Sequence, residues 1–228
     1  MLRKETVTPE TLELLKRLMQ DKLLTSFVLA GGTALALQIA HRRSIDIDLF
    51  SKEAFNETEL SDYLKAAYKF TLDFTAKNTL KGEIHGIKVD FITHSYPDIL
   101  KPLTIEGVRM ASLEDIAAMK LNAIIGSGSR VKDFVDVAYL SSQLSLKKMI
   151  QSYAAKYSEN NSIMALKALN FHNDINFKEP VQLLESGFNW DAIVLRLREM
   201  TKDPDKIFTR IKMTEDKINV THRVKRGR

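Results

Sequence analysis

The chain has 228 residues, 44% of them hydrophobic and 28% charged, which is typical of an ordinary soluble globular protein with a proper core. It has no cysteine, which excludes disulfides, thiolate nucleophiles and cysteine-ligated zinc. No apolar run approaches the roughly 18 residues of a membrane span, so we expect a cytoplasmic protein with no membrane partner, and the net charge of +5 hints mildly at a polyanionic partner.

The N-terminal half alternates between helical and extended patterns. Leucines recur at helical spacing after Thr8, which is a suitable cap, and Gly31-Gly32 ends a short apolar run that indicates a buried strand. The expected helices are Thr8 to Leu24, Thr33 to His41 and Asn56 to Tyr68. The expected strands are Phe27 to Ala30, Ile45 to Phe50, Phe70 to Ala76, Thr79 to His85 and Ile87 to Thr93.

From Ser112 onward the strand patterns stop and helical patterns remain. The expected helices are Ser112 to Ile125, Arg130 to Ser141, Ser145 to Tyr157, Ser162 to Asn170 and Trp190 to Thr201. We therefore expect an α+β fold, with an α/β domain over residues 1–110 and a helical subdomain over 111–228 that closes a crevice, where ligands tend to bind. A basic tail at 221–228 carries four cations and either contacts RNA or is solvated.

Acidic residues recur on one face of the strand expected at Ile45 to Phe50. Asp46 and Asp48 are two residues apart, so both carboxylates leave the same face of a strand. If the strand at Ile87 to Thr93 pairs beside it, Asp90 joins them, and a hard cation such as Mg²⁺ (or Mn²⁺) would neutralise the three carboxylates. The alternative is a solvent-facing edge strand with surface acid pairs. The residues expected to face the core are Ile45, Ile47 and Leu49.

The Gly31-Gly32 turn joins a strand to a helix. Such a turn presents free backbone N–H groups at a helix start, and glycine lets an anion approach the backbone closely. Thr33 adds a hydroxyl in the first turn. Many turns of this kind contain glycine for geometry alone, so the pair has a purely structural alternative.

Together these motifs resemble the AbiEii/AbiGii-type nucleotidyltransferases of the DNA-polymerase-β-like superfamily. The resemblance lies in Leu29-Ala30-Gly31-Gly32-Thr33-Ala34-Leu35 followed by His41-Arg42-Arg43-Ser44-Ile45-Asp46-Ile47-Asp48-Leu49-Phe50. It implies a polymerase-β-like domain with a mixed sheet, in which Gly32 and Thr33 contact a nucleoside triphosphate (NTP). It also implies that Asp46, Asp48 and Asp90 hold the metal.

A lysine on an apolar helical stripe and two acids on the next helix form a second group. Lys120 either extends its amine into solvent or pairs with an anion. Asp133 and Asp136 lie three apart, and the connection at 126–129 is short, so the lysine can meet them. The family carries similar motifs at Lys120-Leu121-Asn122-Ala123 and Arg130-Val131-Lys132-Asp133-Phe134-Val135-Asp136. By that resemblance Lys120 neutralises nucleotide phosphate, and Asp133 or Asp136 orients it or handles a proton. His41 and Arg43 either touch phosphate or lie in a solvated loop.

The expected activity is metal-dependent transfer of a nucleoside monophosphate from an NTP to an acceptor. The resemblance implies the toxin of a bacterial toxin–antitoxin or phage-defence pair, with tRNA as the acceptor and an antitoxin encoded by a neighbouring gene. A small molecule or a protein side chain as acceptor is an alternative, and so is a non-catalytic module that binds nucleotide or RNA.

Overall fold

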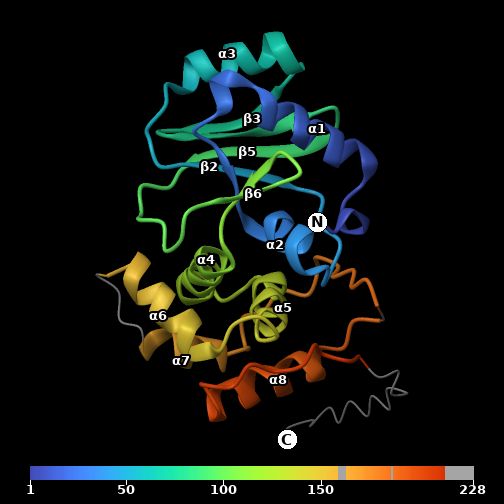
Figure 1. Cartoon of the computed structure of the whole chain (residues 1–228), viewed down its shortest axis with the longest axis vertical. Helices are drawn as coiled ribbons and strands as arrows, with labels where there is room; N and C mark the ends of the chain where they lie inside the picture. The colour runs from blue at the N-terminus through green and yellow to red at the C-terminus, as the bar shows by residue number, and fades with distance from the viewer. Residues whose placement is uncertain (159–162, 186, 214–228) are drawn as a thin grey trace, which may run out of the picture.

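The computed structural model describes residues 1–158, 163–185 and 187–213, in which a mixed sheet precedes a set of packed helices (Figure 1). The helices are α1 (Pro9–Gln20), α2 (Gly31–Ile39), α3 (Glu57–Tyr68), α4 (Leu113–Gly126), α5 (Val131–Leu140), α6 (Leu146–Lys156), α7 (Ile163–Leu169) and α8 (Trp190–Lys202), with 3₁₀ turns at Lys4–Thr6 and Lys22–Leu24. The strands are β1 (Val28–Leu29), β2 (Ile47–Ser51), β3 (Thr71–Ala76), β4 (Thr79–Ile84), β5 (Ile87–Thr93), β6 (Leu103–Ile105) and β7 (Val108–Met110). The predicted α+β class is confirmed, and the basic tail lies outside the described residues.

The sheet has the strand order β3-β4-β5-β2-β1-β7-β6. The pairs β2–β5 and β1–β7 are parallel and the other neighbours are antiparallel. The predicted pairing of the two acidic strands is therefore confirmed as β2 beside β5. β6 and β7 form a hairpin that the sequence patterns did not indicate. Its turn, Glu106-Gly107, has positive φ at both residues, a geometry more often signalled by Asn-Gly or Asp-Gly.

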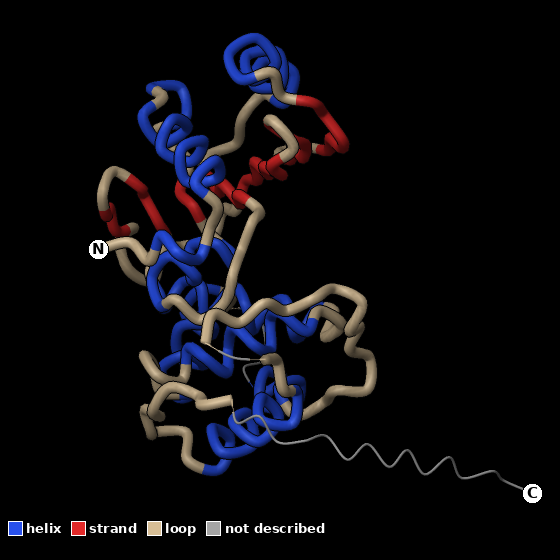
Figure 2. Tube along the Cα trace, turned by 90° about the vertical axis from the view of Figure 1, so that its right-hand side faces the viewer, coloured by secondary structure: helices blue, strands red, loops and turns tan. Residues whose placement is uncertain are grey.

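Helices lie on either side of the sheet (Figure 1). α1 and α3 contact sheet strands on one side, while α2 contacts β2 and also the helices α4 and α5. In Figures 1 and 2, α2 accordingly lies between the sheet and the helical half, with α8 at the far end from α3. No helix in the described ranges is long and apolar enough to cross a membrane.

Two expected boundaries around the acidic strand are wrong, and both differences affect the site. α2 begins at Gly31 and not after the glycine pair, so both glycines belong to its first turn. β2 begins only at Ile47, so Asp46 lies just ahead of the strand. Ile45, predicted to face the core, is 63% exposed because the alternation of a strand does not yet apply to it.

Candidate active site

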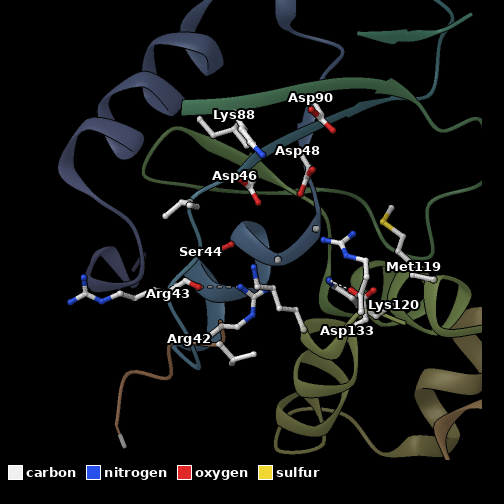
Figure 3. Close-up of a pocket in the computed structure, with 18 of the residues that line it drawn as sticks. Arg42, Arg43, Ser44, Asp46, Asp48, Lys88, Asp90, Met119, Lys120 and Asp133 are labelled. Atoms are coloured by element: carbon white, nitrogen blue, oxygen red, sulfur yellow. Dashed lines mark hydrogen bonds and ion pairs between the residues drawn. The ribbon is translucent and has the colours of Figure 1, made fainter. Parts of the chain in front are cut away.

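Three aspartates line one cavity on the wall formed by β2 and β5 (Figure 3). Asp48 on β2 stands directly opposite Asp90 on β5 in the parallel register. Asp46 reaches the same cavity from the segment ahead of β2. The three aspartates therefore line one cavity, although Asp46 lies just ahead of β2 and not on it. Their role as metal ligands stays a prediction.

Burial and neighbouring charges oppose ionisation of Asp48. Burial raises the pKa of the Asp48 carboxyl to about 6, against the opposing charge of Lys120, and the nearby charges of Asp90 and Asp46 raise it further. A bound divalent cation would reverse this balance, because oxygen ligands from clustered carboxylates suit Mg²⁺. The ligand type and the charge of the three groups therefore fit such a cation.

Asp90 has a partner of its own in this arrangement. Lys81 lies opposite it on β4, and the lysine Nζ donates a hydrogen bond of 2.8 Å to the Asp90 carboxylate. Within the described ranges, no group of three His, Cys, Asp or Glu side chains is arranged to hold a metal as it stands. Lys81 binds one carboxylate oxygen of Asp90 and therefore competes with a cation for the charge of this group.

The two glycines at the start of α2 allow close approaches that a side chain would prevent. Gly31 has a φ of +66°, and a Cβ there would overlap with a carboxylate oxygen of Asp48. A Cβ at Gly32 would overlap with a guanidinium nitrogen of Arg42. Both glycines line the cavity, where the first turn of a helix leaves N–H groups available for an anion.

Thr33 ties this helix start to the acidic segment. It is fully buried, its hydroxyl donates to the backbone carbonyl of Asp46, and it lies 2.8 Å from the Ser44 hydroxyl. Thr33 is not among the residues that line the cavity. The structure thus gives this hydroxyl a role in holding Asp46, and its predicted contact with phosphate stays a prediction.

A buried network of charges lies across the cavity from the carboxylates. The Asp136 carboxylate is fully buried and accepts bonds from Arg42 Nε at 2.7 Å and from a terminal guanidinium nitrogen at 3.0 Å. Lys120 Nζ lies 2.7 Å from Asp136 and donates to Asp133 at 2.6 Å. Burial opposes ionisation of Asp136, but Arg42 and Lys120 hold its pKa well below the usual range. The predicted meeting of Lys120 with these acids is confirmed.

His41 and Arg42 are buried beside Asp136, whereas Arg43 is not. His41 has its Nε2 2.7 Å from Asp136, and burial lowers its pKa to about 4. Of its two predicted alternatives, the solvated loop is wrong, and contact with phosphate stays a prediction. Arg43 is exposed and lines the cavity, so its predicted contact with phosphate stays a prediction. Arg42, which the sequence reasoning passed over, is 4% exposed and also lines the cavity. Its partner Asp136 is 94 residues away, so no local pattern signals the pairing.

The cavity has a volume of about 520 Å³ and is lined from both halves of the chain. The sheet side contributes the start of α2, the segment into β2, and residues of β4 and β5; the helical side contributes α4, α5 and residues 180–182. The backbone N–H of Arg43 donates to the carbonyl of Gln182 at 2.8 Å, which fixes that last segment at the rim. Seven cationic side chains face four carboxylates in the lining. The boundary between subdomains at residue 110 stays a prediction.

Comparison with known proteins decides the family. Residues 13–211 match the family described as nucleotidyl transferase AbiEii toxin of a type IV toxin–antitoxin system. The chain belongs to the AbiEii nucleotidyltransferase toxin family. An uncharacterised protein from Aquifex aeolicus is 30% identical over 171 residues, which cover 72% of this chain and 82% of that protein.

Solved structures show the same fold. MenT4, a nucleotidyltransferase toxin from Mycobacterium tuberculosis, superimposes on this AbiEii-family chain with a TM-score of 0.56 at 14% identity, covering 86% of each chain. JHP933 from Helicobacter pylori gives a TM-score of 0.50 at 19% identity, covering 86% of this chain and 92% of its own. The resemblance predicted from the motifs is confirmed. The protein is a nucleotidyltransferase, and its family implies an NTP substrate and an antitoxin partner.

Proposed function

We propose that this AbiEii-family enzyme transfers a nucleoside monophosphate from an NTP to an RNA, with tRNA as the first acceptor to test, in a reaction that requires a divalent cation. One observation carries the proposal. Asp46, Asp48 and Asp90 line the same cavity as the glycine start of α2 and the buried amine of Lys120. Carboxylates for a cation and cationic groups for a triphosphate thus face each other across one space.

The phosphate-binding side of the cavity is held in place before any ligand arrives. Three of the five guanidinium N–H groups of Arg42 donate within the described chain, to Asp136 and to the carbonyl of Arg43, and a guanidinium has five in all. Two therefore remain for a phosphate beside Gly32. Lys120 supplies a compact charge suited to phosphate, while Arg43 and the N–H groups of the helix start complete the set. Asp136 orients both Lys120 and Arg42.

The carboxylate side carries out the transfer. Asp46, Asp48 and Asp90 would hold the cation, which would neutralise charge on the reacting phosphate. Asp90 also takes the proton of the attacking hydroxyl, whose oxygen forms a bond to the α-phosphorus as the bond to pyrophosphate breaks. Asp133 lines the cavity and accepts a hydrogen bond from Lys120, so it positions the amine that neutralises the departing pyrophosphate.

An RNA acceptor is supported by the charge that surrounds the site. Lys88 and Arg130 line the cavity in addition to the groups assigned to the triphosphate, as do Lys81 and Lys132, which are paired with Asp90 and Glu179. Cations beyond those that one nucleotide needs favour a second polyanion. The toxin role of the family is consistent with modification of an essential RNA.

The test uses purified protein with Mg²⁺ or Mn²⁺, each α-labelled NTP in turn, and total tRNA. We expect label on RNA, loss of transfer in Asp46→Asn and Asp48→Asn, and no effect of Asp73→Asn, whose side chain is on the exposed edge strand β3. Label on protein or on a small molecule would refute the RNA acceptor. Absence of both transfer and metal-dependent NTP binding would refute the activity itself.

A further inference from the structure

A second cavity, of about 200 Å³, adjoins the cavity of the candidate active site, called the catalytic cavity below, near the end of β2. The two share Phe50 and Met119 as walls, and the consecutive residues Ala30 and Gly31 each line one of them. In Figure 3, Met119 lies on α4 beside Lys120, across from Asp48. A ligand whose phosphates rest at the start of α2 therefore has a neighbouring space for its remaining part.

The linings of the two cavities differ in charge. The catalytic cavity has three more cationic side chains than carboxylates, seven against four. The second has two lysines, Lys52 and Lys156, against Glu53, Asp98 and Asp115. The charge of the lining thus favours phosphate in the first space and disfavours it in the second.

The charged pair at the base of the second cavity is already satisfied. Asp115 and Lys156 are both buried and lie 2.8 Å apart. Asp115 also accepts bonds from the Ser112 hydroxyl and from two backbone N–H groups, while Lys156 donates to the carbonyl of Pro97. Because this buried pair already has its hydrogen-bond partners, it does not need an ion from the ligand. The cavity therefore suits a ligand that stacks on its walls and forms hydrogen bonds at its rim.

One wall of the second cavity is aromatic. The rings of Phe50 and His94 lie 5.4 Å apart between centroids, tilted by 33°. The Tyr157 hydroxyl lies 3.0 Å from His94 Nε2, and the centroids of the Tyr96 and His94 rings are 4.8 Å apart, so the histidine ring is held in place. Burial, together with the charge of Lys156, lowers the pKa of His94 to about 4. At neutral pH the wall is therefore an uncharged ring pair.

We propose that the second cavity binds the nucleobase of the NTP, with His94 and Phe50 as the surface on which the base stacks. This inference rests on the proposed function, because it takes the triphosphate to lie at the start of α2. Ser26, Lys52, Glu53 and Asp98 line the cavity around the rings and supply donors and acceptors for the edge of the base. Aromatic stacking accepts any base, so discrimination among the four NTPs is assigned to these polar groups.

The experiment measures binding without turnover. Calorimetry with Mg²⁺ compares the α,β-methylene analogues of the four NTPs with tripolyphosphate, which lacks a base, in the wild type, His94→Ala and His94→Phe. We expect His94→Ala to weaken analogue binding by roughly 5- to 100-fold, the range that stacking on one ring spans. His94→Phe should stay within about threefold of the wild type, because it keeps a ring. Tripolyphosphate should bind equally to all three proteins. Phe74→Ala, an exposed ring on β3, is the matched control and should change nothing.

Different failures have different meanings. Unchanged analogue affinity in His94→Ala, with tripolyphosphate binding intact, overturns the base subsite and leaves the proposed function standing. A raised KM for the RNA acceptor with unchanged analogue affinity overturns it in favour of an acceptor subsite. If neither tripolyphosphate nor any analogue binds the wild type, the proposed function fails and the subsite fails with it. Thermal melts show whether each variant is folded. If His94→Ala is not folded, His94→Phe becomes the test, and weakened analogue binding by this variant overturns the stacking role.

Discussion

Asp136→Asn is the change that most directly tests the buried network behind the cavity. Asparagine keeps the shape of the side chain but removes the charge that Arg42 and Lys120 share. Removing one partner of a buried pair costs about 3–5 kcal/mol. Because Lys120 keeps its bond to Asp133, we expect the lower end, about 3 kcal/mol. For a chain of this size that corresponds to a fall of roughly 6–12 °C in Tm.

The assay is urea unfolding followed between pH 3 and pH 8. The pKa of Asp136 is depressed in the folded protein, so its contribution to stability is complete above the unfolded value near 4 and is lost as the pH falls below it. The difference between the wild type and Asp136→Asn should therefore be constant from pH 5 to 8 and shrink in acid. Asp133→Asn is the matched control and should lose less than half as much. A loss under about 1 kcal/mol for Asp136→Asn, or equal losses in the two variants, would refute the network as described.

Three further changes test the facing wall and the glycine turn. Gly32→Ala should weaken NTP binding by about tenfold or more in calorimetry, because its Cβ must displace the neighbouring guanidinium of Arg42. Gly126→Ala, which has open space around it, should bind NTP like the wild type. Equal NTP affinities of the two variants would contradict the packing argument. Asp48→Asn should stabilise the metal-free protein at pH 8. The raised pKa of Asp48 means that its stabilising contribution is present below pH 4 and lost as the pH rises through about 6, so a gain that does not shrink toward pH 4 in urea titrations would count against this account. Lys81→Met should change the free energy of unfolding by less than about 1 kcal/mol, because the ion pair it removes is partly exposed. It should also lower the Mg²⁺ concentration at half-saturation, because Asp90 is then free of its lysine. An unchanged Mg²⁺ titration would show that the pair does not compete with the metal.

Periodicity was enough to predict most elements of the fold. α4 illustrates why, since its apolar stripe gives the helix and the cap is local, with the Ser112 hydroxyl accepting from the Asp115 N–H at 3.0 Å. The β6–β7 hairpin was missed because strands of three residues are too short for alternation to show. The start of α2 differs from the prediction because a glycine pair ordinarily interrupts a helix, whereas here both glycines form its first turn.

In the candidate site, too, some residues have a local sequence signal and others do not. Asp48 and Asp90 follow from alternation along strands, and Lys120 from its place on an apolar stripe, so each was visible locally. Arg42 was not, because a buried cation is recognisable only from its counter-ion, and the counter-ion of Arg42 lies on α5. The second cavity was equally hidden, since its walls come from β1, β2, α4, α6 and the segment after β5. Spatial convergence of distant segments leaves no periodic trace in the sequence.

The two walls of the catalytic cavity are stabilised in opposite ways. On the helical wall, Asp136 is satisfied by three side chains, so the groups assigned to phosphate need little rearrangement when a nucleotide arrives. On the sheet wall, Gly31 takes a left-handed conformation against Asp48, whose pKa is raised, and Asp90 is occupied by Lys81. The raised pKa of Asp48 means that ionising this carboxyl costs folding free energy, and a cation that neutralises it returns that free energy as binding. The cation and nucleotide are therefore expected to act mainly on the sheet wall, while the helical wall serves as the fixed reference against which the substrate is positioned.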